Sequence, residues 1–301
     1  MKKARPLWRV SVLTSPEAEE AVAELLAWIV EEPVSVYLDA ETRDALVAAY
    51  LNERRQFSET KRRQVEAGLR AIAEVGLSIG PGQIKVRRVR REDWAESWKR
   101  HFKPLAIGSS LLVQPSWSKR KPTRDQKVVI LDPGLSFGTG RHPTTRFCLR
   151  QLAAFRKEKR AQSLLDIGTG SGILAISAAK LGYGPVTGID FDPEAIRVAR
   201  ANAARNGVLA QAGLACRDLM KLPLRPARKY DVICANLIYD LLLVGKTRIL
   251  SRLKPGGLLV LSGILRSQFP AVQLAYEGQK LKLLQKKAGN EWESGAFVLQ
   301  K

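Results

Sequence analysis

One segment of the sequence indicates the fold class most clearly: Leu164-Leu165-Asp166-Ile167-Gly168-Thr169-Gly170-Ser171-Gly172-Ile173-Leu174. An apolar run is followed by alternating glycines and then by the start of an apolar helix. Glycines allow a tight backbone turn and let a ligand approach without a Cβ in the way. Their spacing is G-x-G-x-G, whereas the dinucleotide fingerprint needs its last glycine one residue later, where Ile173 stands. The Lys-Ser/Thr pair of a phosphate-binding loop is also missing.

The alternation of strands and helices continues on both sides of this stretch. We expect strands at 163–167, Val186–Asp190, Tyr230–Asn236 and 258–261, and helices at Ile173–Lys180 and Pro193–Arg205. Asp192 can cap the second of these helices, and Asn206-Gly207 can end it. The pattern predicts an α/β domain with a Rossmann-like, doubly wound parallel sheet over residues 126–301.

The first part of the chain has a different rhythm. Strand patterns at 8–13, Val34–Leu38 and 84–89 accompany a helix that begins at Ser15-Pro16 and a second helix over Glu59–Glu74. Residues 41–52 fit either a helix or a strand. We therefore expect a small α+β domain over residues 1–90, for which a ferredoxin-like sandwich is one candidate. Residues 91–125 are expected to form a linker helix and a connecting segment.

The composition is that of a globular protein with a basic excess. The 301 residues are 45% hydrophobic, which excludes a disordered or fibrous chain, and the net charge is +21. Residues 126–301 carry +15 of that charge. The densest basic clusters are 156–160, 225–229 and 280–287. They are either a solvated surface or a surface for a polyanionic partner, of which nucleic acid is the first candidate.

The cysteines and histidines do not suggest a metal site. Cys148, Cys216 and Cys234 are widely spaced in apolar surroundings, and His101 and His142 are far apart. We expect buried, reduced thiols, no metal, and a cytoplasmic protein. No apolar run reaches the length of about 18 residues that a membrane span requires, so no membrane contact is expected.

Two carboxylates flank the glycine turn. Asp166 would deter a pyrophosphate and suit a cationic ligand, while Asp190 ends the next strand, where a carboxylate can accept hydrogen bonds from ribose hydroxyls. A cationic ligand with a ribose and no phosphate matches S-adenosylmethionine. The alternative is an ordinary turn that binds another nucleoside.

Two further segments carry candidate site residues. Asn236 ends an apolar strand at the expected ligand edge of the sheet, where it either accepts a hydrogen bond from an amine or only forms a turn. Residues 132–145 form a loop rich in glycine and hydroxyl groups. This loop can close over a ligand, and Thr145 or His142 can bond to it, or the loop is a purely structural turn and helix start. His142 is a weak candidate for a catalytic base.

These segments together resemble one known family. The residues are Phe137-Gly138-Thr139-Gly140-Arg141-His142-Pro143-Thr144-Thr145, the glycine turn 166–174, Gly188-Ile189-Asp190-Phe191-Asp192-Pro193, Ala235-Asn236-Leu237, the linker 93–104 and Gln114-Pro115-Ser116-Trp117. They resemble the ribosomal protein L-eleven methyltransferase family (PrmA), class I S-adenosylmethionine-dependent enzymes. The resemblance is strong over residues 90–265 and extends to the first domain only in layout.

The resemblance implies a function. It implies methylation of lysine side chains and an α-amino group of a large-subunit ribosomal protein, with S-adenosylhomocysteine as product and the first domain recognising the substrate. With a ribosomal substrate, the basic clusters become a candidate surface for electrostatic contact with ribosomal RNA. The family's cofactor positions fall on Thr145, Gly168, Asp190 and Asn236.

Within the same motifs, Asp166, Gly170 and Thr139 are further cofactor candidates. Arg141 and Ser136 depart from the Thr and Ala common in the family, which bears on substrate choice. The alternative hypotheses are that the chain is an RNA methyltransferase, an N-methyltransferase of another protein, or a non-catalytic binding module.

Overall fold

The computed structural model of the chain describes residues 6–32, 34–38, 44–74, 76–89, 104–132, 142–157 and 160–300. It divides into two units, residues 1–102 and 103–301, each of which has its own core. Among the described residues, no helix has the length and apolar character needed to cross a bilayer.

The first unit is a four-stranded antiparallel sheet covered by two helices. Its elements in chain order are β1 (Leu7–Thr14), α1 (Glu19–Val30), β2 (Val34–Leu38), β3 (Ala45–Leu51), the short 3₁₀ helix η1 (Arg54–Gln56), α2 (Glu59–Glu74) and β4 (Gln83–Val89). The strands lie in the order β2-β3-β1-β4. This βαββαβ arrangement is that of a ferredoxin-like sandwich, which agrees with the expected α+β class.

Two local features of this unit differ from the sequence expectation. Residues 45–51, which fit either pattern, form β3, because alternate apolar side chains such as Val47 and Ala49 face the two helices. Helix α1 begins at Glu19 and not at Ser15-Pro16. The Ser15 hydroxyl accepts a hydrogen bond from the Ala18 N–H at 3.3 Å, so the chain makes a turn before the helix starts.

The second unit is built on a seven-stranded sheet. Its strands are β8 (Leu164–Ile167), β9 (Val186–Asp190), β10 (Ala212–Cys216), β11 (Tyr230–Asn236), β12 (Leu253–Leu265), β13 (Leu281–Gly289) and β14 (Trp292–Leu299). Their order is β10-β9-β8-β11-β12-β14-β13. Strands β8 to β12 are parallel to one another, whereas β14 is antiparallel to both β12 and β13. The order reverses between β8 and β11, and such a switch point is where open α/β sheets bind ligands.

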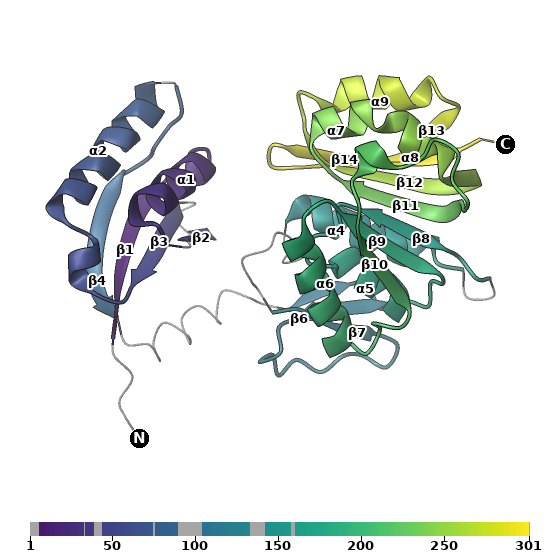
Figure 1. The fold of residues 1–301 in the computed structure, drawn as a ribbon, viewed down its shortest axis with the longest axis horizontal. Helices are drawn as coiled ribbons and strands as arrows, with labels where there is room; N and C mark the ends of the chain where they lie inside the picture. The colour runs from purple at the N-terminus through teal and green to yellow at the C-terminus, as the bar shows by residue number, and fades with distance from the viewer. Residues whose placement is uncertain are drawn as a thin grey trace. The chain divides into compact units, whose positions relative to one another are not determined.

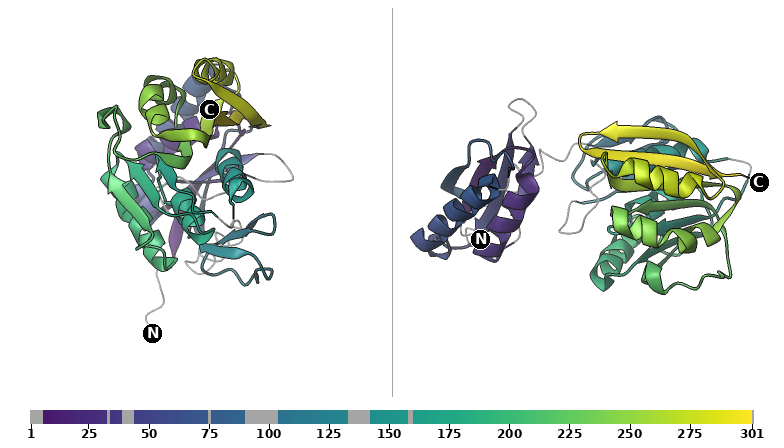
Figure 2. Two further views of the ribbon diagram at one scale, coloured as in Figure 1. Left: turned by 90° about the vertical axis from the view of Figure 1, so that its right-hand side faces the viewer. Right: turned by 90° about the horizontal axis from the view of Figure 1, so that it is seen from above.

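Helices cover both faces of this sheet, which confirms the expected doubly wound class. One face packs against α4 (Pro143–Phe155), α5 (Ile173–Lys180) and α6 (Pro193–Arg205), and the other against α7 (Tyr239–Val244), α8 (Lys246–Ser251) and α9 (Phe269–Glu277) (Figure 1). The 3₁₀ helix η2 (Leu219–Lys221) follows β10. The hairpin of β13 and β14 closes one edge of the sheet (Figure 2).

A third, smaller sheet lies in the stretch 104–130. Strands β5 (Leu105–Ile107), β6 (Leu111–Gln114) and β7 (Lys127–Ile130) pack against α4 and α5. Asn206, at the end of α6, bonds to both the N–H and the carbonyl of Ile130 at 2.7 Å. We had expected a connecting segment up to residue 125, but apolar side chains such as Leu111 and Val113 bury β6 within the core of the second unit. The expected helix at 93–102 lies outside the described residues.

The cysteines do not all match the expected buried thiols. Cys148 and Cys234 are buried, whereas Cys216 is exposed. Cys216 is the last residue of β10, an outer strand, so no neighbouring strand covers it on that side. The expectation was therefore wrong for Cys216.

Candidate cofactor site

The glycine turn follows the end of β8. At Gly168 and Gly172 its backbone adopts a conformation that only glycine adopts readily. Gly168 and Gly172 have φ values of +73° and +82°. A Cβ on Gly168 would lie 2.5 Å from Leu237 Cδ2, and one on Gly172 would lie 3.1 Å from the Cβ of Ala199. The turn therefore brings the β8 backbone close to β11 and to α6, and α5 begins directly after it.

Asp190 is held by backbone donors at the end of β9. Its Oδ2 accepts a hydrogen bond from the Gly170 N–H at 2.9 Å, and its Oδ1 accepts one from the Asp192 N–H at 3.1 Å. Each oxygen keeps a second lone pair for another donor. A carboxylate fixed in this way is preorganised to receive a vicinal pair of hydroxyls.

Asp166 lies beneath the turn and is completely buried. Burial raises the pKa of its carboxyl from 3.8 to about 7, and the negative charge of Asp190 adds to this rise. The Thr169 hydroxyl, which donates to Asp166 Oδ2 at 2.6 Å, acts in the opposite direction. Asp166 therefore changes charge near neutral pH, and a cation bound nearby would favour its ionised form.

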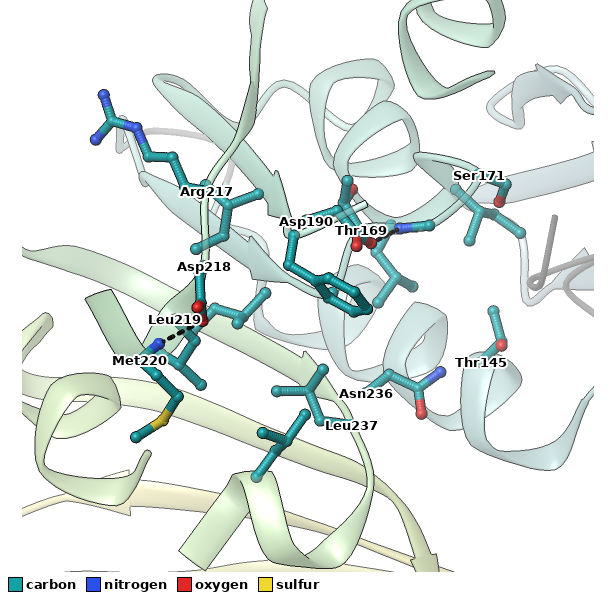
Figure 3. Close-up of a pocket in the computed structure, with 18 residues that line it drawn as sticks. Thr145, Thr169, Ser171, Asp190, Arg217, Asp218, Leu219, Met220, Asn236 and Leu237 are labelled. Carbon is teal, nitrogen blue, oxygen red and sulfur yellow. Dashed lines mark hydrogen bonds between the residues drawn. The ribbon is translucent and has the colours of Figure 1, made fainter. Parts of the chain in front are cut away.

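Thr145 and Asn236 face the same cavity from different elements (Figure 3). Thr145, in the first turn of α4, is 1% exposed, and its hydroxyl has no hydrogen-bond partner within the described chain. A buried hydroxyl without a partner costs about 1–3 kcal/mol, which a bound ligand can recover. Asn236 ends β11, and Gly263 leaves room for its amide, since a Cβ there would lie 3.0 Å from Asn236 Oδ1.

The cavity measures about 520 Å³, within the range of small-molecule sites. Gly168, Gly170, Asp190, Thr145 and Asn236 all line it, so the structure brings five of the predicted cofactor residues together. Asp166 lies directly below through its bond to Thr169, which also lines the cavity. Within the described residues, no cluster of three or more His, Cys, Asp or Glu side chains could hold a metal ion.

Some lining residues were not found from the sequence. Phe191 is 72% exposed beside Asp190, and Asp218, Leu219 and Met220 form the opposite wall. Asp218 Oδ1 accepts a hydrogen bond from the Met220 N–H at 2.8 Å, which leaves Oδ2 for a ligand (Figure 3). Asp218 follows β10 much as Asp190 ends β9, so recognising residues 212–216 as a strand would have found it.

Thr139 lies outside the described residues. Of the other predicted residues, His142 does not join this group. His142 is the N-cap of α4 and is not part of the cavity lining. Its Nδ1 lies 2.6 Å from Thr144 Oγ1, and its ring packs edge-on against Trp292 with centroids 5.2 Å apart. Burial lowers the pKa of His142, and nearby Glu291 partly offsets that effect.

Comparison with known proteins agrees with this geometry. The model of the family described as "Ribosomal protein L11 methyltransferase (PrmA)" matches residues 6–299. The chain belongs to this family. The resemblance found in the sequence is thereby confirmed, and it extends through the first domain and not only over residues 90–265.

Individual relatives match over nearly the whole chain. A ribosomal protein L11 methyltransferase of Chloroflexus aurantiacus is 35% identical, and the match covers 94% of this chain and 95% of the relative. One from Alkaliphilus oremlandii is 34% identical with the same coverage. The crystal structure of a ribosomal protein L11 methylase from Lactobacillus delbrueckii subsp. bulgaricus is 31% identical in sequence, with a TM-score of 0.58. The match covers 66% of this chain and 100% of the chain in that structure.

Proposed function

We propose that this chain transfers methyl groups from S-adenosylmethionine to amines of ribosomal protein L11, at lysine side chains and at the α-amino group. The observation that carries the proposal is the cavity at the sheet's switch point. There the anchored carboxylate of Asp190, the buried Thr145 hydroxyl, which has no partner among the described residues, and the Asn236 amide at the end of β11 meet. Membership of the methyltransferase family supports the same substrate.

The residues present fit this cofactor. Asp190 would accept hydrogen bonds from the two ribose hydroxyls, and the Thr145 hydroxyl would gain the partner it lacks. Asp218 Oδ2 can accept from an exocyclic amine, and Phe191 offers an aromatic surface to a purine. When bound, S-adenosylmethionine supplies an electrophilic methyl group on a positively charged sulfur.

The charges around the cavity favour cationic ligands. Asp190 and Asp218 line it, and Asp166 lies just below. The whole chain carries +21, which would repel a lysine-rich substrate. The three carboxylates provide a local negative potential that opposes this repulsion where the amine must enter.

The amine must lose its proton before it can attack. For a lysine of pKa about 10.4, deprotonation at pH 7 costs about 4.6 kcal/mol. Desolvation in the cavity and a neighbouring sulfonium both lower the amine's pKa, so the site itself can meet much of this cost. The Asn236 carbonyl would accept an N–H of the neutral amine and aim its lone pair at the methyl group.

Incubation with radiolabelled S-adenosylmethionine tests the proposal. Free L11, purified 50S subunits and naked RNA are offered in separate reactions. We expect label in L11 in the reactions that contain L11, and no label in the RNA. Label in RNA would identify an RNA methyltransferase, label in another ribosomal protein a different substrate, and no label a binding module.

The variant Asn236→Ala tests the positioning role. It should slow transfer at saturating cofactor at least about tenfold, which corresponds to one lost charge-dependent hydrogen bond in the transition state. Full transfer rate with normal cofactor affinity would show that Asn236 does not orient the amine.

A further inference from the structure

A second cavity lies between α4 and the β13–β14 hairpin. It measures about 220 Å³. Its lining combines three cations, Arg146, Arg150 and Lys287, with an apolar floor that includes Pro143, Phe147 and Trp292. Because an α-helix turns by about 100° per residue, positions 143, 146, 147 and 150 share one face of α4, while Thr145 is on the opposite face. This cavity is therefore separate from the cofactor site.

The walls of this cavity are held together by specific contacts. The Gln151 amide on α4 donates to Gln285 Oε1 on β13 at 2.9 Å. A bulge between Leu283 and Gln285 interrupts the register of β13, so that Leu283 packs on the α9 side while Gln285 and Lys287 reach α4. Gly289 permits the close approach, because a Cβ there would lie 2.8 Å from the Cβ of Pro143.

The three cations have no ionic partners in the part of the chain that the structure describes. None of Arg146, Arg150 and Lys287 has a carboxylate within 4.0 Å there, whereas the adjacent Lys286 pairs with Glu293 at 3.7 Å. Glu291 lies in the turn of the β13–β14 hairpin, and its negative charge raises the pKa of His142. Three like charges around one hollow repel one another, and a bound anion would relieve that repulsion.

We propose that this cavity binds a nucleotide of single-stranded RNA, with the phosphate on Arg146, Arg150 and Lys287 and the base against Trp292. The volume is below the usual range for a whole metabolite but leaves room for part of a polymer. Unstacked RNA bases bind aromatic side chains while arginine and lysine hold the backbone. An acidic peptide would use the cations but leave the aromatic floor unused.

This site refines the electrostatic expectation from the sequence. Of the three densest basic clusters, only 280–287 contributes to it, through Lys287, and the helix face of α4 supplies the two arginines. The inference does not depend on the proposed methyl acceptor, because it concerns binding alone.

Fluorescence anisotropy with a short labelled single-stranded RNA tests the proposal on the full chain. We expect the triple variant Arg146→Ala, Arg150→Ala, Lys287→Ala to bind RNA at least about tenfold more weakly. The slope of log affinity against log salt should fall by about 0.7, because the three cations share one phosphate and each single-strand phosphate contact contributes about 0.7. The matched control removes three exposed cations from another loop, as Lys119→Ala, Lys121→Ala, Arg124→Ala, and should change affinity less than about threefold.

A second variant separates the base from the phosphate. Trp292→Leu should weaken RNA binding about fivefold or more while leaving the salt slope unchanged, because stacking involves no counterion. Unchanged affinity for S-adenosylhomocysteine in both cavity variants serves as the folding control. Equal losses in the two triple variants would overturn the proposal. So would a poly-glutamate that competes as well as RNA of equal charge, since it would identify an acidic protein surface as the ligand.

Discussion

Replacement of Asp166 by Asn should make the ligand-free protein more resistant to unfolding at neutral pH and above. The carboxyl is completely buried and its pKa is raised from 3.8 to about 7. The protonated form is therefore favoured in the fold, and its stabilising effect is fully present below pH 3.8 and is lost as the pH rises to about 7. Asn is isosteric and always neutral, and its carbonyl can still accept the hydrogen bond from Thr169.

The size of this effect follows from the two pKa values. Their difference corresponds to about 4 kcal/mol at pH 8, at about 1.4 kcal/mol for each pH unit. Urea titrations of the parent and Asp166→Asn at pH 5 and pH 8 measure it. The variant's advantage in the free energy of unfolding should grow by roughly 3 kcal/mol between these pH values, since part of the penalty is already present at pH 5.

The matched control is Asp125→Asn, an exposed aspartate in the turn before β7. Its difference from the parent should stay constant with pH. If the free energy of unfolding of Asp166→Asn changed with pH in the same way as that of the parent, burial would not raise the pKa of this carboxyl and the argument would be refuted. Asp166→Asn should stabilise the fold but weaken cofactor binding, because an ionised Asp166 favours a cationic ligand.

Three further substitutions test other contacts. Thr145→Val should weaken cofactor binding about five- to tenfold, as measured by calorimetry, without lowering the melting temperature, because the hydroxyl has no partner to lose among the described residues. In Asp190→Asn, the amide would point a donor at the Gly170 or Asp192 N–H, so we expect at least a tenfold loss of S-adenosylhomocysteine affinity, and an unchanged affinity would contradict the ribose role. Asn206→Ala should cost about 3 kcal/mol in urea unfolding, one for each of its three bonds to Ile130 and Asn202, and should speed proteolysis at 115–126.

The sequence predicted the parts of this molecule that depend on short-range patterns. The three glycines before α5 and the aspartate at the end of β9 follow from local sequence, because strand, turn and helix signals lie within a few residues. Helix α2 was likewise expected with its observed bounds, Glu59–Glu74.

The parts that depend on tertiary contacts were missed. Strand β10 is only five residues long and contains Gly213, so its pattern is weak, and Asp218 was overlooked with it. Strands β5 and β6 pair with each other, and their apolar side chains pack into the same core as those of α4 and α5, a contact that no short-range pattern reveals. The cavity around Trp292 combines residues about 140 positions apart, and no local pattern in the sequence joins them.

Helix α4 presents ligand-binding side chains on two opposite faces, Thr145 towards the cofactor cavity and Arg146 and Arg150 towards the hairpin. Because both cavities are lined by this one helix, any change that a ligand in one cavity makes in α4 reaches the other cavity. If RNA tightens cofactor binding by some factor, the cofactor must tighten RNA binding by that same factor. The chain would then hold RNA most firmly while charged with methyl donor and release it as the donor leaves.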